Sequence, residues 1–460
     1  TLTNVRVRNS TQSSRTDEDR STGITVKGDA DLSMDDVVVD NFDTGIRFEN
    51  TSLATTTTPT LTNVRVRNST QSIRTDSFGT IGIQISGNVF PALSDVEIED
   101  VQTGIVYTDA ISLPRETPTL TNVRVRNSTQ SIRSESTGAL FSNVSSVALD
   151  DCEFDGFSQG MVISTDDTRA VSTPTLTNVR VRNSTQSSRN STSVGLDISG
   201  DVIMGMYDSI VDDYDLGIRY NGGAQSTRLS TPTLTNVRVR NSTQSSRNLR
   251  TGIQLIDLIN IVMENDSIVG YHTGLEITTT ESRTVSTPTL TNVRVRNSTQ
   301  STRDENVGFF LGEGVAGILE QSYVEGASVG ILIAEGNQTL LIRNLIKNCE
   351  IGIRASSFSG ALPIRWQEFH LTQEFMMQYP GFNFRAFDLL FTGPWYILNN
   401  TIYGYSKALT ASLAEVDFIN NIVWGHWYGY EPFVCSDVSL QANYNNINYM
   451  EGIYPGAGYQ

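Results

Sequence analysis

The sequence predicts an all-β fold, a right-handed parallel β-helix (β-solenoid) of about sixteen coils. Two nested repeats and an alternation of apolar with polar residues lead to this prediction. The longer repeat is the 13-residue segment TLTNVRVRNSTQS, which recurs at spacings of 56 to 59 residues. A fixed period of this size indicates a protein built from stacked repeats. The identical copies start at Thr1, Thr60, Thr119, Thr175, Thr233 and Thr289.

A shorter repeat divides each long one into two coils. A glycine followed by an apolar residue recurs from Gly23 to Gly352, and spacings of 22 residues alternate with spacings of 34 to 37 residues over most of this range. The 22-residue coil is compact, and the longer coil carries the constant segment. We expect the glycine to lie at a sharp bend, where a positive φ angle favours a residue without a Cβ atom.

The repeated units have the pattern of β-strands. Apolar and polar residues alternate at Val5–Arg8 and at Ile24–Lys27, a period of two that places one face inward and one outward. The apolar residues are mostly β-branched, as strands favour. A meander of hairpins is disfavoured because Asn-Gly and Asp-Gly turn signals do not recur at regular places. Stacked at about 4.8 Å per coil, the coils would form a rod of roughly 75 Å.

Composition limits the functional classes. The chain has 460 residues and a net charge of −17, which argues against general binding to nucleic acid or anionic membranes. No apolar stretch approaches the length of a membrane span. Cys152, Cys349 and Cys435 are too few and too far apart for a disulfide framework or a zinc site, and we predict no metal and no cofactor. Abundant Thr, Ser, Asn and Gly with scarce Lys suit a secreted or cell-surface protein.

Three regions follow from the pattern. Residues 1–354 are the repetitive β-helix, residues 355–394 interrupt it with an aromatic-rich insertion or flap, and residues 395–460 resume the coils. We expect the aromatic side chains of this insertion and of the last coils to bind a partner or to stack on sugar rings. The alternative is that they only pack the flap and the end of the rod. The candidate contacts are Trp366, Phe375, Tyr379, Phe382, Trp424, Trp427 and Tyr428.

Several units resemble a known superfamily. LSDVEIEDVQTGI at 93–105 resembles the repeats of right-handed parallel β-helix proteins, which include pectate lyases. FINNIVWG at 418–425, with YNNI at 444–447 and YPG at 454–456, resembles large secreted surface proteins of Bacteroidetes-like bacteria. The resemblance implies a β-helix over nearly the whole chain. The lyase pattern of calcium-binding aspartates beside a catalytic Arg or Lys is not recognisable, so no catalytic residue is implied and we predict that the protein is not an enzyme.

The arginines of the constant segment form a predicted charge ladder. When coils are aligned by their glycines, the second arginine faces an acid in five of six repeats, and only Arg240 meets an apolar residue, Val269. We expect these pairs to fix the register of the coils, because a slip of one coil would stack Arg on Arg. An arginine stripe that binds polyanions is the alternative, which the interleaved acids weaken. The predicted pairs are Arg8 with Asp40, Arg65 with Glu97, Arg67 with Glu99, Arg124 with Glu153, Arg126 with Asp155, Arg182 with Asp212, and Arg296 with Glu325.

The leading functional hypothesis is an extracellular structural or adhesive rod that associates with other copies of itself or with other surface components. Open strand edges at both ends of the coil pattern favour such association. The alternative is a polysaccharide-binding or polysaccharide-cleaving β-helix. Cleavage by paired carboxylates requires two acids on one face. Two sets of acids are spaced for such a role, Asp35 with Asp36 and Asp40, and Asp150 with Asp151 and Asp155. Asn9-Ser10-Thr11 and its copies also match the N-glycosylation sequon.

Overall fold

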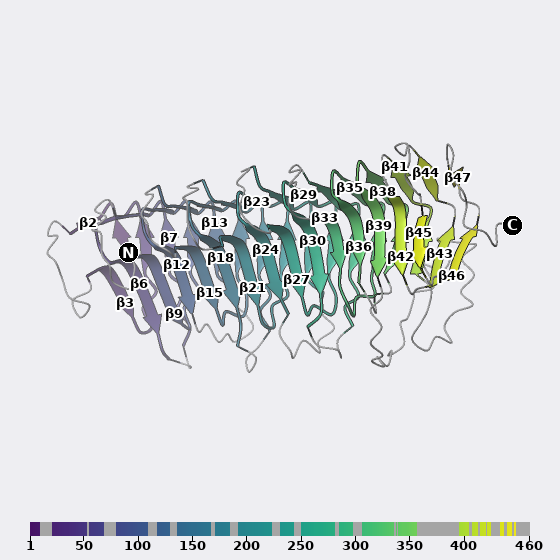
Figure 1. The fold of residues 1–460 in the computed structure, drawn as a ribbon. Coiled ribbons are helices and arrows are strands. Elements are labelled where there is room, and N and C mark those ends of the chain that lie inside the picture. Colours follow the sequence, from purple (N-terminus) through teal and green to yellow (C-terminus); the bar gives the residue numbers. More distant parts are fainter. Residues whose placement is uncertain are drawn as a thin grey trace.

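The computed structural model is a right-handed parallel β-helix, as predicted, and each coil adds one strand to each of three parallel sheets (Figure 1). Every strand pairs with the corresponding strand of the next coil, and no pairing is antiparallel among the described residues. The structure describes residues 1–9, 21–52, 55–68, 80–108, 117–128, 136–166, 171–184, 192–222, 231–242, 250–280, 285–297, 306–334, 337, 339–356, 395–403, 407–412, 415–419, 421–424, 433–436, 439–443 and 446–447.

Sheet A has sixteen strands. They are β1 (Leu2–Thr3), β4 (Ser33–Asp35), β7 (Thr60–Thr62), β10 (Ala92–Ser94), β13 (Thr119–Thr121), β16 (Ala148–Asp150), β19 (Thr175–Thr177), β22 (Gly205–Tyr207), β25 (Thr233–Thr235), β28 (Val262–Glu264), β31 (Thr289–Thr291), β34 (Ile318–Glu320), β37 (Leu340–Ile342), β40 (Trp395–Leu398), β43 (Glu415–Ile419) and β46 (Ser439–Asn443).

Sheet B also has sixteen strands. They are β2 (Arg6–Arg8), β5 (Val38–Asp40), β8 (Arg65–Arg67), β11 (Glu97–Glu99), β14 (Arg124–Arg126), β17 (Glu153–Asp155), β20 (Arg180–Arg182), β23 (Ile210–Asp212), β26 (Arg238–Arg240), β29 (Ser267–Val269), β32 (Arg294–Arg296), β35 (Tyr323–Glu325), β38 (Leu345–Lys347), β41 (Thr401–Tyr403), β44 (Ile422–Trp424) and β47 (Asn446–Ile447).

Sheet C has fifteen longer strands. They are β3 (Thr22–Lys27), β6 (Thr44–Asn50), β9 (Ile81–Gly87), β12 (Thr103–Thr108), β15 (Thr137–Ser142), β18 (Gln159–Ser164), β21 (Val194–Ser199), β24 (Leu216–Asn221), β27 (Thr251–Ile256), β30 (Thr273–Thr278), β33 (Val307–Leu311), β36 (Val329–Ile333), β39 (Ile351–Ser356), β42 (Lys407–Ser412) and β45 (Phe433–Ser436).

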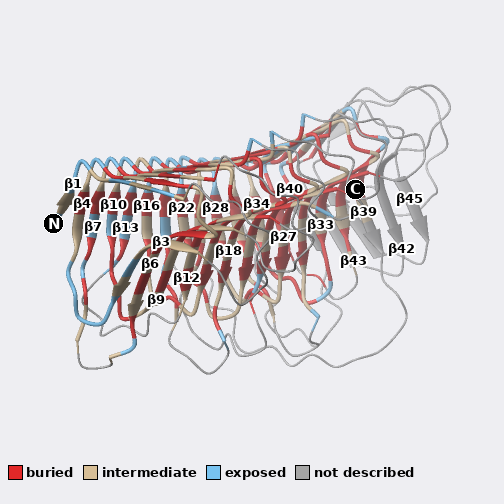
Figure 2. Ribbon diagram, turned by 90° about the vertical axis from the view of Figure 1, so that its left-hand side faces the viewer, coloured by how far each residue is buried: buried red, intermediate tan, exposed pale blue. Residues whose placement is uncertain are grey.

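A continuous apolar core runs along the axis of the rod. In the short strands of sheets A and B the central residue points inward, as Leu93 and Ile98 do, while its two neighbours point outward. Figure 2 shows buried residues along the strands of the described coils. Burial of each such side chain contributes about 1.5–3 kcal/mol to the stability of the fold. The alternation of apolar and polar residues in the sequence therefore decides which face of each strand points into the core. Among the described residues, no helix has the length and hydrophobicity needed to cross a bilayer.

The prediction that the repeated glycine needs a positive φ angle is wrong. Gly45 is absent from the left-handed region, but a Cβ atom built on it would lie 2.3 Å from Cγ1 of Val66 and 2.6 Å from the carbonyl oxygen of Gly82. The glycine is thus required by close packing at the start of the sheet C strands. The left-handed bends between sheets A and B fall mostly on Asn and Asp residues, such as Asn63 at φ 52° and Asp95 at φ 54°.

Candidate binding face on sheet B

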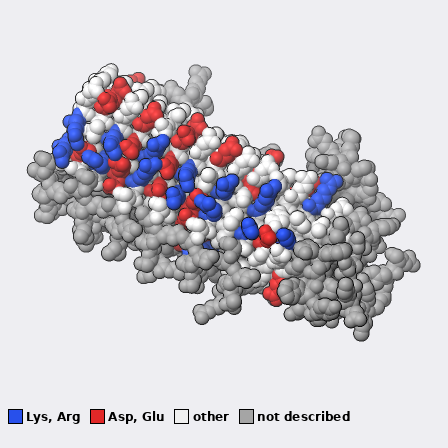
Figure 3. All heavy atoms as spheres, turned by 90° about the horizontal axis from the view of Figure 1, so that it is seen from above, with Lys and Arg blue, Asp and Glu red and all other residues white. Residues whose placement is uncertain are grey.

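The outer face of sheet B carries most of the cationic side chains of the described residues. The first and third residues of each short strand point outward, and the six copies of VRVR place two arginines each on β2, β8, β14, β20, β26 and β32. With Lys347 on β38, the strands of this sheet carry thirteen cationic side chains and seven acids, an excess of six positive charges. Figure 3 shows these cationic and acidic side chains along one side of the rod. The face is therefore cationic on a chain whose net charge is −17.

The structure places the predicted ladder residues opposite one another. Each acid also faces a residue of the following coil, which was not predicted from the sequence; Glu99, for example, lies between Arg67 and Arg126. Arg240 lies opposite Val269, as the alignment indicated. The opposed pairs are Arg8 with Asp40, Arg65 with Glu97, Arg67 with Glu99, Arg124 with Glu153, Arg126 with Asp155, Arg182 with Asp212, and Arg296 with Glu325.

The ion pairs do not all follow this register, because several arginines reach diagonally. Arg126 bonds Glu153 at 2.6 Å instead of the opposed Asp155. Arg65 contacts both Glu97 at 3.2 Å and Glu99 at 2.8 Å. The hydrogen bond to Glu99 raises the pKa of Arg65, and that to Glu153 raises the pKa of Arg126.

Two acids of this face are buried beneath arginines. Asp212 is 1% exposed and lies 3.5 Å from Arg180 and 3.1 Å from Arg240. Asp40 is 2% exposed and is shared by Arg6 at 2.7 Å and by an arginine of the next coil. Both carboxylates are thus neutralised from two sides and add little negative charge to the surface.

The charge balance differs between the two halves of the face. Strands β2 to β17 carry six arginines and five acids, whereas strands β20 to β32 carry six arginines and a single acid, the buried Asp212. The arginines are identical in both halves, and the difference lies in the compact coils between them. The compact strand β11 presents Glu97 and Glu99 outward, while β29 presents Ser267 and Val269.

The acids considered for paired-carboxylate chemistry do not converge. Asp35 lies on the outer side of sheet A, Asp36 occupies the bend with φ 55°, and Asp40 is buried on sheet B. The second set, Asp150, Asp151 and Asp155, is distributed in the same way over β16, the bend and β17. Among the described residues, no group of His, Cys, Asp or Glu side chains is arranged to hold a metal ion.

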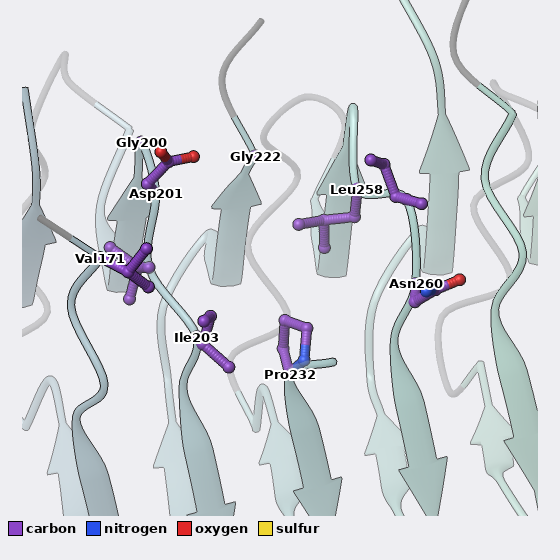
Figure 4. Close-up of a pocket in the computed structure, with 10 residues that line it drawn as sticks. Val171, Gly200, Asp201, Ile203, Gly222, Pro232, Leu258 and Asn260 are labelled. Atoms are coloured by element: carbon purple, nitrogen blue, oxygen red, sulfur yellow. The ribbon is translucent and has the colours of Figure 1, made fainter. Parts of the chain in front are cut away.

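A small hollow lies between the turns that lead from sheet C to sheet A (Figure 4). It has a volume of about 20 Å³, room for about one water molecule and too little for a sugar ring. Val171, Ile203, Pro232 and Leu258 give it a largely apolar wall, with Asp201 and Asn260 at its edge. A ligand larger than water would therefore have to bind outside the coils in this part of the chain.

A polar ladder inside the rod was not predicted from the sequence. At the bend between sheets A and B, Oδ1 of Asn400 accepts hydrogen bonds from the backbone N–H (2.9 Å) and side-chain amide (3.1 Å) of Asn344. Oδ1 of Asn421 accepts the corresponding bonds from Asn400. The sequence signal for this ladder was an Asn directly before an apolar strand at the same place in successive coils. The ladder is interior and contacts no ligand surface.

Asp266 occupies the same interior position in an earlier coil. Its side chain is buried, Oδ1 accepts a hydrogen bond of 2.7 Å from the backbone N–H of Val237, and Oδ2 has no hydrogen-bond partner. Burial raises the pKa of Asp266 to about 8. The side chain is therefore protonated at neutral pH and stands where other coils have an uncharged residue such as Ser209 or Ser322.

The sequon asparagines serve the bend that follows each VRVR strand. Asn241 is 5% exposed, and its Nδ2 donates a 2.7 Å hydrogen bond to the carbonyl oxygen of Tyr214. Asn297 is 6% exposed and donates to the carbonyl oxygens of Tyr271 and His272. In the folded protein these two amides are occupied by structural bonds and are not available as sites for glycan attachment.

The predicted aromatic contacts fall mostly beyond what the structure describes. Trp424 lies on β44, opposite Tyr403 in register. The other candidates lie outside the described residues, namely Trp366, Phe375, Tyr379, Phe382, Trp427 and Tyr428.

No family model matches the sequence, and no curated protein matches it. Among solved structures, the periplasmic alginate epimerase AlgG is 10% identical, with a TM-score of 0.37 over 91% of this chain and 78% of that chain. The Dettilon tailspike protein is 10% identical, with a TM-score of 0.30 over 93% and 61%. The A-module of the Azotobacter vinelandii mannuronan C-5 epimerase AlgE4 is 12% identical, with a TM-score of 0.26 over 88% and 91%. These likenesses concern the fold alone.

Proposed function

We propose that this protein is an extracytoplasmic rod that binds polysaccharide along the outside of sheet B. The observation that carries the proposal is the excess of six cationic side chains on that face, on a chain whose net charge is −17. An extended repetitive surface of this kind suits an extended repetitive ligand, because every second coil offers the same pair of arginines again. Arginine forks add directional hydrogen bonds to carboxylate or sulfate groups.

The proposal is binding and not cleavage, because six of the seven acids on the strands of this face are paired with arginines, and the seventh, Asp155, accepts a hydrogen bond from the backbone N–H of Ser184. Glu97 and Glu99 bond Arg65, Glu153 bonds Arg126, and Asp212 is buried between two arginines. A general acid or nucleophile needs an accessible carboxyl group opposite the scissile bond, and these carboxylates are held by guanidinium groups.

Binding is tested directly by affinity electrophoresis of the purified chain in gels containing single polysaccharides. We expect retardation by at least one acidic polysaccharide, weakening as salt is raised because exposed charges are screened. Migration unchanged by every acidic and neutral polysaccharide would overturn the proposed function.

A structural rod that self-associates is the second candidate function. The observation that favours it is the continuity of the three sheets, with sixteen strands in each of sheets A and B, which makes one long stiff body from stacked coils. Electron microscopy of the protein in its source material separates the two functions. Regular filaments with the repeat of this rod would establish the structural role, whereas isolated rods would oppose it.

A further inference from the structure

We infer that the ligand is a linear acidic polysaccharide, bound as a single chain parallel to the rod axis, and that it binds only over strands β20 to β32. The inference rests on the proposed function and specifies its ligand class and its position. It comes from the unequal distribution of acids along a face whose arginines are the same in every repeat.

The local charge differs between the two halves of the face. In strands β20 to β32 six arginines stand against one acid, so the local excess is five, whereas strands β2 to β17 have an excess of only one. The single acid, Asp212, is 1% exposed and is covered by Arg180 and Arg240. An incoming anion would therefore meet mainly guanidinium groups over β20 to β32. Over β11 and β17 it would also meet carboxylates, which repel it.

Three arginines of strands β20 to β32 keep exposed guanidinium groups. Among the described residues, neither Arg238 nor Arg294 forms an ion pair, and both are exposed. They flank β29, whose outward residues Ser267 and Val269 offer no competing carboxylate. Arg296, though paired with Glu325 at 3.5 Å, keeps 65% of its side chain exposed. These guanidinium groups therefore retain free N–H donors that point away from the core.

The spacing of the arginines defines the shape of the cationic strip. Arginine pairs recur every second coil, about 10 Å apart along the axis, and the two arginines of a pair lie on one three-residue strand about 10 Å long. The cationic strip is thus long in the axial direction and narrow across it. A single polymer chain that carries regularly repeated carboxylates can lie along this strip and contact each pair in turn.

Other polyanions fit less well. A nucleic acid duplex, whose major groove alone is about 12 Å wide, would extend beyond the strip over neighbouring acidic surface. Single-stranded nucleic acid gains much of its binding from bases stacked on aromatic side chains. The compact strands within this part of the strip present Ile210, Ser267 and Val269 outward, bury Asp212, and carry no aromatic ring.

The test uses two reciprocal exchanges between compact strands of the same protein. In the double variant Ser267→Glu/Val269→Glu, the strand Ser-Ile-Val of β29 becomes Glu-Ile-Glu, the sequence that β11 already has between two VRVR strands. In Glu97→Ser/Glu99→Val, β11 acquires the sequence of β29. Each variant places between arginines a strand that the fold already accommodates there, so both are expected to fold. Circular dichroism and thermal unfolding verify this.

Binding is measured by biolayer interferometry with immobilised polygalacturonate as the probe, and with neutral glucan, a sulfated glycan and a single-stranded oligonucleotide as comparisons. We expect the Ser267→Glu/Val269→Glu variant to lose about tenfold or more in affinity, because each acid occupies neighbouring guanidinium groups. We expect Glu97→Ser/Glu99→Val to bind more tightly than the native protein, because it frees the arginines of β8 and β14 as a second cationic patch, separated from the first by β17.

The outcomes separate the two proposals. If no polysaccharide binds the native protein, the proposed function fails. If an acidic polysaccharide binds and neither exchange alters its affinity, the proposed function stands and the site on β20 to β32 is overturned. Tighter binding to the oligonucleotide than to polygalacturonate overturns the ligand class, and tighter binding to the sulfated glycan overturns the carboxylate as the group recognised.

Discussion

The guanidinium of Arg6 bonds the buried carboxylate of Asp40 at 2.7 Å, although the residue opposite Asp40 in register is Arg8. We propose that such pairs fix the register of the coils. Asp40→Ala would leave cationic side chains on two coils without their shared partner, and we expect a loss of about 1–3 kcal/mol in the free energy of unfolding. Denaturant unfolding measures this loss. Glu264→Ala on the exposed side of sheet A is the control and should cost less than about 0.5 kcal/mol; equal costs would contradict the register role.

Asp266 should make stability depend on pH. Its pKa is about 8 in the fold against an ordinary value of 3.8, so the folded state favours the protonated form. Its contribution to stability is therefore complete below about pH 4, declines as pH rises, and is lost above about pH 8. Asp266→Asn, which keeps the shape without the charge, should have little effect at pH 4 and stabilise the protein by about 2–5 kcal/mol at pH 8.

The measurement for Asp266 is a pair of unfolding curves at each pH, one for the native chain and one for Asp266→Asn. The difference between them should widen steadily from pH 4 to pH 8. Parallel pH profiles for the two proteins would show that Asp266 is not protonated in the fold.

The repeated glycine should be intolerant of a methyl group for steric reasons. Gly45→Ala would bring a Cβ atom 2.3 Å from Val66, and we expect destabilisation of about 2–4 kcal/mol because the core cannot yield without disturbing its neighbours. Gly28 has φ 75°, and a Cβ atom added there would meet no heavy atom within 4 Å, so Gly28→Ala should cost only about 1 kcal/mol through backbone strain. A larger loss at Gly28 than at Gly45 in thermal unfolding would refute the steric account.

The fold could be predicted from the sequence because it follows from periodicity. The two-residue alternation in Val5–Arg8 decides the buried face, and the glycine spacing gives the length of a coil. The opposed pairs could be aligned for the same reason. The diagonal ion pair of Arg126 with Glu153 could not be predicted, because it depends on side-chain rotamers and not on strand register. The protonation of Asp266 could not be predicted either, because it follows from burial of the side chain inside the coil.

The interior asparagine ladder should stabilise the coils beyond what an apolar residue of similar size provides. Asn400 is 1% exposed, and its side chain accepts two hydrogen bonds from Asn344 and donates to the carbonyl oxygen of Leu341 at 3.1 Å. Valine fills the corresponding position in other coils, as Val96 does, so Asn400→Val fits the space. It nevertheless removes the acceptor for the backbone N–H of Asn344, and an unsatisfied buried donor costs about 1–3 kcal/mol.

We therefore expect Asn400→Val to lower the unfolding temperature and to speed hydrogen exchange at the Asn344 amide. Val96→Ala, which removes apolar volume at an equivalent place but no hydrogen bond, should lower the unfolding temperature and leave exchange at Asn344 unchanged. Unchanged exchange in Asn400→Val would mean that the ladder contributes packing alone, because the Asn344 amide would then be protected without its side-chain acceptor.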